Sequence, residues 1–458
     1  MSAQTLRFES KERIILSLNQ DEITRLARAR AVEVIVKYAD TKASLRHMLR
    51  MYLQESHDDA AVKRQVQYLV ISVIRHKNTI DYLLTRGDPT LSFGKLDVED
   101  QIRLRLALFE NRWLNEPLMT LGSHYLKWRT KLRSVLQTAA AIDLDQSIES
   151  LSEIEKLSIL YSHPTFIIET LLEHMNEDEV IELMKENQTP PITYLRPNTM
   201  SEIGTLSISN LISKGVSLAP DPEVQNLFIV REGLADLIQT KEFRNGAVLI
   251  HDKASVIAVD ILGPKSEHIV WDACAAPGMK TQYICEKMEN EGKLIASDIN
   301  RNRLKGSMKR LKSWGCSSVA WLLGDAIECP ITGANKILID APCTSTGMLQ
   351  SHPSYKWRLN KSWLFSLMTI QSKLLEAVIS SYSDYPETEV VYSTCSMLPH
   401  EGESQIDSVL ERFDIELVDI EDIPGQGYSG FNCSKKVRRF FPHLHKTNGF
   451  FVAKFRIL

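Results

Sequence analysis

The amino-acid sequence predicts an α/β protein with a doubly wound, mostly parallel sheet in its second half, preceded by a small α+β subdomain and an all-α N-terminal bundle. From about residue 245 onward, short apolar runs rich in β-branched residues alternate with helical segments. Apolar strands that end in polar residues are typical of a parallel sheet covered on both faces. Before residue 140, apolar residues instead recur at steps of three and four, which is the helical period.

The composition is that of an ordinary globular protein. Of 458 residues, 43% are hydrophobic and 24% are charged, with 20 Gly and 17 Pro, which excludes collagen-like and wholly disordered chains. No stretch approaches about 18 apolar residues, and the charged start MSAQTLRFESKERIIL lacks the apolar run of a signal peptide. We therefore expect a soluble cytoplasmic protein without a membrane partner; a nucleolar setting stays open for a eukaryotic source.

Cysteine usage points to reduced thiols. The seven cysteines are an odd number, are scattered and form no C-x-x-C pair, so neither a disulfide framework nor a zinc ribbon is expected. His443 and His445 lie near Cys433, but the two-residue step and the missing fourth ligand argue against a metal. The cysteines are Cys274, Cys285, Cys316, Cys329, Cys343, Cys395 and Cys433.

Charge is distributed unevenly along the chain. Residues 1–140 contain 23 Lys and Arg against 16 Asp and Glu, whereas residues 141–240 contain 5 against 17. The first segment also interleaves basic residues with Trp113, Tyr125 and Trp128, which suits stacking on RNA bases and suits a helical core equally well. We expect three regions: a helical domain over 1–140, an acidic linker with helices and a small α+β subdomain over 141–240, and a catalytic domain over 241–458.

Within the middle region the sequence predicts helices over 153–161 and 164–187. The second begins at Pro164 and ends before Pro190 and Pro191. Seven strands are then expected. They are HIVWDACA, KLIASDI, SVAWLLGDA, KILIDAPC, EVVYSTCS, IELVDI and FFVAKFRIL. In such a sheet, ligands bind beyond the carboxyl ends of the strands.

The residues that close the first strands form a nucleotide-binding pattern. A small-residue turn follows the first strand, and lone aspartates, Asp298 and Asp325, follow the next two. The turn lets backbone N–H groups approach a ligand carboxylate, Asp298 is spaced to accept ribose hydroxyl protons, and Asp325 suits an adenine amine. A dinucleotide is less suited, because Gly-x-Gly-x-x-Gly is absent; S-adenosylmethionine carries no phosphate and fits the carboxylates. Aspartates acting only as helix caps are the alternative.

Cys343 and Cys395 close two further strands and predict a covalent reaction. Carbon 5 of cytosine is a poor nucleophile, and a thiolate adding to carbon 6 makes the ring an enamine that attacks the methyl donor at carbon 5. Asp340, if protonated, can stabilise charge that develops on the ring. A second group must then help remove the carbon 5 proton and expel the thiolate. Chemistry alone does not decide which cysteine has which role.

Three motifs resemble the signatures of the Sun/Fmu-type RNA cytosine-carbon-5 methyltransferases, namely DACAAPGMKT (272–281), DAPCTSTG (340–347) and STCS (393–396). Weaker matches are YSHPTFIIETLL (161–172), PPITYLRPNT (190–199), HDKAS (251–255) and RFFPHLHKTNGFFVAKF (439–455). The helical, basic first part is similar to the NusB-like RNA-binding domain of bacterial members. The resemblance implies a class I, Rossmann-like methyltransferase fold.

The resemblance also implies residue roles. Cys395 corresponds to the nucleophile and Cys343 to the cysteine that assists product release. The expected S-adenosylmethionine pocket is formed by Cys274, Ala275, Ala276, Pro277, Gly278, Met279, Lys280, Asp298, Arg303, Asp325 and Asp340. Met279, Pro197 and His251 depart from the usual family residues without removing a reactive group.

The sequence therefore predicts a monomeric enzyme that methylates carbon 5 of a cytosine in structured RNA, with ribosomal RNA preferred and transfer RNA as the alternative. DNA methylation is a weaker option, and a non-catalytic RNA-binding assembly factor is the alternative from another class. Lys435, Lys436, Arg438 and Arg439 are expected to contact the RNA backbone or to lie in a solvated loop.

Overall fold

The protein is represented by a computed structural model that describes residues 19–41, 44–88, 93–127 and 129–458. The chain forms two compact units, Met1–Ser150 and Leu151–Leu458. Within the described residues, none of the helices combines the length and apolar character needed to cross a membrane.

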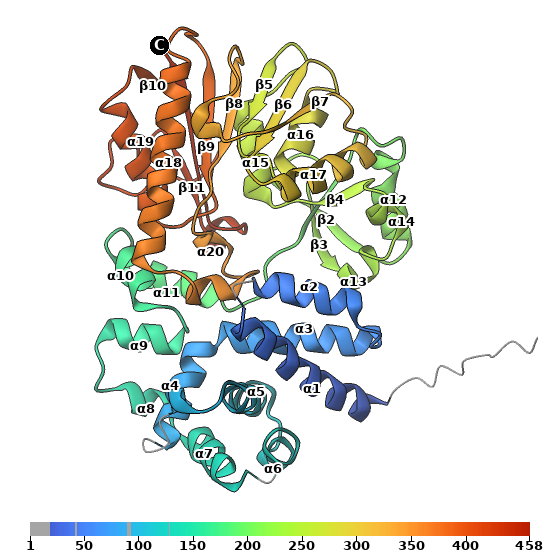
Figure 1. The fold of residues 1–458 in the computed structure, drawn as a ribbon, viewed down its shortest axis with the longest axis vertical. Helices are drawn as coiled ribbons and strands as arrows, with labels where there is room; N and C mark the ends of the chain where they lie inside the picture. Colours follow the sequence, from blue (N-terminus) through green and yellow to red (C-terminus); the bar gives the residue numbers. More distant parts are fainter. Residues whose placement is uncertain (1–18, 42–43, 89–92, 128) are drawn as a thin grey trace, which may run out of the picture. The chain divides into compact units, whose positions relative to one another are not determined.

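The first unit is helical, as predicted (Figure 1). A buried ion pair joins its first and fifth helices, since Arg28 lies 2.6 Å from Glu110, which also accepts a hydrogen bond from the Tyr125 hydroxyl at 2.5 Å. Tyr125 is fully buried and is therefore a core residue, while Trp128 lies outside the described residues. The helices are α1 (Gln20–Ala39), α2 (Leu45–Glu55), α3 (Ala60–Arg75), α4 (Lys77–Gly87), α5 (Val98–Leu114), α6 (Leu118–Leu121), α7 (Thr130–Ala141) and α8 (Leu144–Ile148).

The second unit begins with three short helices, α9 (Glu153–Leu160), α10 (Thr165–Leu172) and α11 (Glu177–Glu186). The single helix predicted over 164–187 is wrong, because it is divided into α10 and α11. The physical reason is a helix start inside the segment, where the Asn176 side chain accepts a hydrogen bond from the N–H of Glu179 at 2.9 Å. An Asn followed three residues later by a Glu was the signal in the sequence.

A small antiparallel sheet follows. Its four strands are β1 (Tyr194–Pro197), β2 (Ser217–Pro220), β3 (Phe228–Glu232) and β4 (Val248–Ile250), in the order β2-β3-β1-β4. Its helices are α12 (Gly204–Ser213), α13 (Leu234–Leu237) and α14 (Lys241–Arg244). The α+β character predicted for this part of the chain is present, and the sheet is completed by β4, which lies beyond residue 240.

The large sheet contains all seven predicted strands and one more, β11. The strands are β5 (Ile269–Asp272), β6 (Lys293–Asp298), β7 (Val319–Leu323), β8 (Lys336–Asp340), β9 (Glu389–Thr394), β10 (Ile415–Leu417), β11 (Arg438–Phe440) and β12 (Phe450–Ile457). Their order is β10-β12-β9-β8-β5-β6-β7, with β11 paired to β12. Strands β5 to β9 are mutually parallel, whereas β12 runs antiparallel to β9. The order reverses at β5, which places the switch point between β5 and β8.

Both faces of this sheet are covered (Figure 1). Side chains of α18 (Lys361–Ser381) and α19 (Glu403–Leu410) share one apolar cluster with Trp271, Ile337 and Tyr392. Side chains of α15 (Lys253–Leu262), α16 (Met279–Lys287) and α17 (Arg301–Ser313) share a second cluster with Val270 and Leu338. This burial explains why the strands read as continuous apolar runs, and it leaves the strand ends as the place for polar chemistry.

Candidate active site

The predicted site residues meet at the carboxyl edge of the parallel strands. Asp272, Asp298 and Asp340 are the last residues of β5, β6 and β8. The strands are in register so that Asp340 pairs with Ser393 of β9, two residues before Cys395. The structure therefore brings the aspartates and the two cysteines to one edge of one sheet.

The turn after β5 requires glycine at one position. Gly278 has φ +98° and precedes the first residue of α16, Met279. A Cβ atom at Gly278 would lie 2.9 Å from Cδ1 of Leu311, too close for ordinary packing. The turn is held from β6, because the N–H of Ala275 donates to the carbonyl of Ser297 at 2.8 Å. Small residues thus form a turn at the N-terminus of α16, and its hydrogen bond to β6 fixes its position.

Asp298 and Asp325 both receive backbone hydrogen bonds. The Asp298 carboxylate accepts from the N–H groups of Ala276 at 3.0 Å and Asn300 at 2.8 Å. Asp325 accepts from the N–H of Ile327 at 3.0 Å at the start of a short 3-10 helix. The capping alternative therefore holds for Asp325, whereas Asn300 and not Asp298 caps α17. Each carboxylate has lone pairs left for a ligand. Arg303, on α17, donates to the carbonyl of Ala276 on the rim of the same turn.

A lysine and an aspartate pair beside the cysteines. The Lys280 ammonium lies 2.8 Å from Asp340 and 5.4 Å from the centre of the Phe450 ring. Burial disfavours the charged ammonium, but the Asp340 carboxylate outweighs it and raises the pKa of Lys280. Asp340 also accepts a hydrogen bond from the Ser393 hydroxyl at 3.1 Å. Both oxygen atoms of Asp340 therefore accept hydrogen bonds, one from Lys280 and the other from Ser393.

The two cysteines face each other. Sγ of Cys343 lies 3.3 Å from Sγ of Cys395, and both residues are partly exposed. The hydrogen bond from Cys343 lowers the pKa of Cys395, with a smaller effect in the same direction from the Lys280 charge. The same contact, together with burial, raises the pKa of Cys343 well above its usual range. Cys395 is therefore the thiol that ionises first.

Buried polar contacts fix the loops that carry the cysteines. Glu401 accepts from the Thr344 N–H at 2.9 Å and from the Gln371 amide at 3.1 Å. Arg439 forms a fully buried ion pair with Glu403 at 2.5 Å and donates to the carbonyl of Ser396 at 2.9 Å. Ser396 follows Cys395 directly, so this network sets the position of the Cys395 backbone.

Two glycines allow the loops to approach each other. The N–H of Gly347 donates to the carbonyl of Cys395 at 3.0 Å, and the N–H of Gly449 donates to the carbonyl of Gly347 at 2.8 Å. A Cβ atom at Gly347 would lie 1.7 Å from the carbonyl oxygen of Gly449. The segments after β8, after β9 and before β12 are therefore in backbone contact.

Two residues at this edge were not included in the predicted S-adenosylmethionine pocket, although Asp272 begins one of the recognised motifs. Asp272 is 1% exposed, accepts from the Thr281 hydroxyl through Oδ2 and has no hydrogen-bond partner at Oδ1. Burial, with a further contribution from the Asp340 charge, raises the pKa of Asp272 to about 7. Ile299 directly follows Asp298 and is 70% exposed. The signals were present, since Asp272 closes β5 and Ile299 is an apolar residue next to a strand-end aspartate.

The basic cluster near residue 438 differs from its prediction. Arg439 is fully buried, so RNA contact is wrong for this residue. The Arg438 guanidinium donates to the carbonyl of Ile423 at 2.8 Å, and the Lys436 ammonium donates to that of Leu417 at 3.1 Å. Among the four, Lys435 remains exposed. Three of the four side chains thus donate to carbonyl groups, and one of these, Arg439, supports the Cys395 loop.

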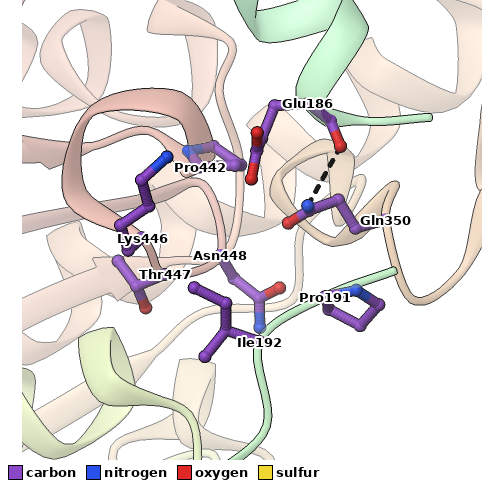
Figure 2. A pocket seen from close by; sticks show the side chains of 8 residues that line it. All are labelled: Glu186, Pro191, Ile192, Gln350, Pro442, Lys446, Thr447 and Asn448. Atoms are coloured by element: carbon purple, nitrogen blue, oxygen red, sulfur yellow. Dashed lines mark hydrogen bonds between the residues drawn. The ribbon is translucent and has the colours of Figure 1, made fainter. Parts of the chain in front are cut away.

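Figure 2 shows the residues that line a small pocket. Its volume of 10 Å³ is at the lower limit for holding one water molecule. Its lining brings two of the weaker motifs together, with Pro191 and Ile192 on one side and Thr447 and Asn448 on the other. Gln350 donates to the carbonyl of Glu186 at 3.0 Å across it. A larger cleft of 670 Å³ lies between the loop at Gln225 and helices α15 and α16. Neither pocket is lined by the predicted site residues.

The large sheet has a Rossmann-like arrangement, and two cysteines face each other at its strand-end site. Residues 259–456 match the family described as 16S rRNA methyltransferase RsmB/F, and residues 25–117 match the NusB family. Residues 259–456 therefore form an RsmB/F-type methyltransferase domain, and the motifs in it resemble those of the Sun/Fmu-type enzymes.

Individual relatives agree with this assignment. A mouse 28S rRNA (cytosine-C(5))-methyltransferase is 31% identical over 322 residues, which are 67% of this chain and 40% of the relative. A tRNA (cytosine(72)-C(5))-methyltransferase from Pyrococcus horikoshii is 32% identical over 49% of this chain and 56% of its own length. This chain thus spans less than two thirds of either relative. The crystal structure of PH0851 covers 94% of this chain and 98% of its own with a TM-score of 0.78 at 24% identity, which shows the shared fold.

Proposed function

We propose that this protein transfers a methyl group from S-adenosylmethionine to carbon 5 of a cytosine in structured RNA, with ribosomal RNA as the substrate. The observation that carries the proposal is the 3.3 Å approach of Cys343 and Cys395 beside Lys280 and Asp340. Two thiols with opposite pKa shifts suit a reaction that needs one nucleophile and one proton carrier.

The residues at the strand ends fit the cofactor. The unpartnered Oδ1 of buried Asp272 suits an ammonium group, the turn at Gly278 suits a carboxylate, and Asp298 suits ribose hydroxyls. Ile299, exposed beside Asp298, suits the face of an adenine, whose amine would meet Asp325. When bound, S-adenosylmethionine supplies an electrophilic methyl group. A phosphate-bearing cofactor fits poorly because so many carboxylates converge here.

The chain's own residues then perform the substrate chemistry. The Cys395 thiolate adds to carbon 6 of the flipped cytosine, which makes carbon 5 nucleophilic. Lys280 keeps positive charge near the base while its partner Asp340 holds it in place. Cys343, whose pKa is raised, is a thiol at rest and is partly exposed, so its proton can pass to solvent. The Cys343 thiolate then takes the carbon 5 proton, the electrons of the C5–H bond re-form the C5–C6 double bond, and the Cys395 sulfur leaves as a thiolate.

The test is methyl transfer from labelled S-adenosylmethionine to separately purified ribosomal and transfer RNA. We expect labelled 5-methylcytidine in ribosomal RNA and none with a Cys395→Ala variant. Transfer RNA is the second candidate, favoured by the Pyrococcus relative, and labelling of transfer RNA alone would replace the first choice. No label in any cellular RNA would contradict the proposal and would favour the assembly-factor alternative.

The first unit is proposed to bind RNA as well, since it matches the NusB family and residues 1–140 are basic. We propose the domain division 1–140, 141–240 and 241–458 for these tasks. A monomer in the cytoplasm, or in the nucleolus of a eukaryote, completes the proposal; neither a membrane nor a metal enters it.

Removing the Asp298 charge should weaken cofactor binding. We expect Asp298→Asn to raise the dissociation constant for S-adenosylhomocysteine by about 10- to 100-fold, because hydrogen bonds to a charged group are stronger than neutral ones. The two backbone N–H groups bond to different oxygens of Asp298, so asparagine keeps one of these hydrogen bonds and loses the other; thermal unfolding checks that the variant is still folded. Titration calorimetry measures the effect. Asp384→Asn, at an exposed position before β9, is the control, and equal affinity in both variants would remove Asp298 from the site.

A further inference from the structure

Ser345 occupies a backbone conformation that disfavours serine. Its φ is +57° and its ψ is +31°, in the left-handed region where glycine, asparagine and aspartate are the usual residues. Ser345 precedes the short 3-10 helix Thr346–Met348, yet its side chain makes no capping hydrogen bond there. Glycine would adopt this conformation without strain, which indicates that the serine side chain makes a contact that offsets the backbone cost.

The Ser345 hydroxyl faces the predicted nucleophile. Its Oγ lies 3.4 Å from Sγ of Cys395, and this is the contact that its side chain makes in the described structure. The Sγ atom of Cys395 therefore has two neighbours that can donate to it, the Cys343 thiol at 3.3 Å and the Ser345 hydroxyl. When Cys395 is a thiol it donates to Ser345, and when Cys395 is ionised the serine hydroxyl rotates to donate to the sulfur.

We infer that Ser345 is a positioning residue that holds Cys395 in its thiolate form through this hydrogen bond, at the expense of a strained backbone. The inference rests on the proposed function only in giving Cys395 the role of nucleophile. The other groups that face Cys395 are Cys343 and Lys280, which favour the thiolate, and Asp340, which opposes it. Burial also opposes ionisation of Cys395, so a second hydrogen-bond donor to its sulfur offsets part of that cost.

The two simplest substitutions separate chemistry from backbone strain. Ser345→Gly removes the hydroxyl and relieves the left-handed strain, so the fold should be as stable as the wild type or more stable. Ser345→Ala removes the hydroxyl and keeps the strain. A purely structural role predicts opposite effects of the two variants, whereas a role in thiolate stabilisation predicts the same effect on Cys395.

The experiment is alkylation of the full-length protein by iodoacetamide across pH, with the Cys395 peptide quantified by mass spectrometry. Both variants should shift the midpoint upward by about 0.5 to 1 pH unit and slow alkylation at pH 7 by roughly 3- to 10-fold, the effect of one lost hydrogen bond to a charged sulfur. Ser351→Ala is the matched control, because the Ser351 hydroxyl donates to the Met348 carbonyl at 3.2 Å instead.

Thiol alkylation needs neither RNA nor methyl donor, so this result is independent of the methylation assay. An unchanged midpoint in both Ser345 variants would overturn the inference even if RNA is methylated. A shifted midpoint without any methyl transfer would leave the inference standing and contradict the proposed function instead. If Ser345→Ala fails to fold, Ser345→Gly alone decides the question.

Discussion

Replacing Cys395 with alanine should reduce methyl transfer to less than about one-thousandth of the wild-type rate, because the uncatalysed attack by carbon 5 of cytosine is very slow. The same variant should form no covalent complex with RNA. Among the two facing thiols, Cys395 has the lowered pKa and Cys343 the raised one, which supports our proposal that Cys395 is the nucleophile. Denaturing gels of enzyme mixed with labelled RNA and S-adenosylmethionine measure the adduct.

Cys343→Ala is the matched partner of that variant. It should still form the adduct and should accumulate it, since the group that assists release is missing while Cys395 is intact. The accumulated adduct also separates a catalytic from a packing role, because a misfolded variant would form none. If Cys343→Ala forms no adduct and Cys395→Ala accumulates one, the two roles are reversed.

Breaking the buried ion pair of Arg439 should destabilise the second unit by about 3–5 kcal/mol, since a lone carboxylate would remain in a dry interior. Both side chains of the Arg439–Glu403 pair are 0% exposed. Arg439→Met keeps the apolar stem but loses the guanidinium, whose carbon lies 4.5 Å from the centre of the Tyr428 ring and 5.1 Å from that of Phe451. Thermal unfolding of the full chain should therefore show a clear decrease in stability, caused mainly by the unpaired charge of Glu403.

Two further variants test whether the loss of stability comes from the buried charge. Arg412→Met breaks an exposed ion pair with Glu376 of similar length, 2.6 Å, and should cost less than about 1 kcal/mol. Combining Arg439→Met with Glu403→Gln removes the stranded charge and keeps an acceptor for the N–H of Tyr428, so part of the stability should return. Equal losses for Arg439→Met and Arg412→Met would contradict the buried-charge argument.

Much of the catalytic domain could be predicted because its signals are local. Continuous apolar runs predicted the seven strands, and their polar ends predicted Asp298, Asp340 and the cysteines as neighbours. The assignment of roles to Cys343 and Cys395 could not come from such a pattern. It depends on a 3.3 Å distance and on the unequal surroundings of two chemically equal thiols.

Arg439 and Asp272 were missed because their surroundings depend on tertiary contacts. Arg439 has the composition of a surface residue, and only its distant partner Glu403 makes it a core residue. Asp272 could be recognised as a strand end, but its unpartnered oxygen is a property of the folded interior. The helix boundary at Asn176 was missed for a different reason, because a capping signal was present and the apolar period ran on through it.

The backbone contact between Gly347 and Gly449 has a consequence for genetics. Neither residue carries a reactive group, yet any side chain at Gly347 would collide with a carbonyl oxygen 1.7 Å away. A saturation screen for loss of activity should therefore score both positions as strictly as the cysteines themselves. Positions without reactive groups would then mark the backbone contact between these two loops. A map of tolerated substitutions would therefore locate that contact from mutational data alone.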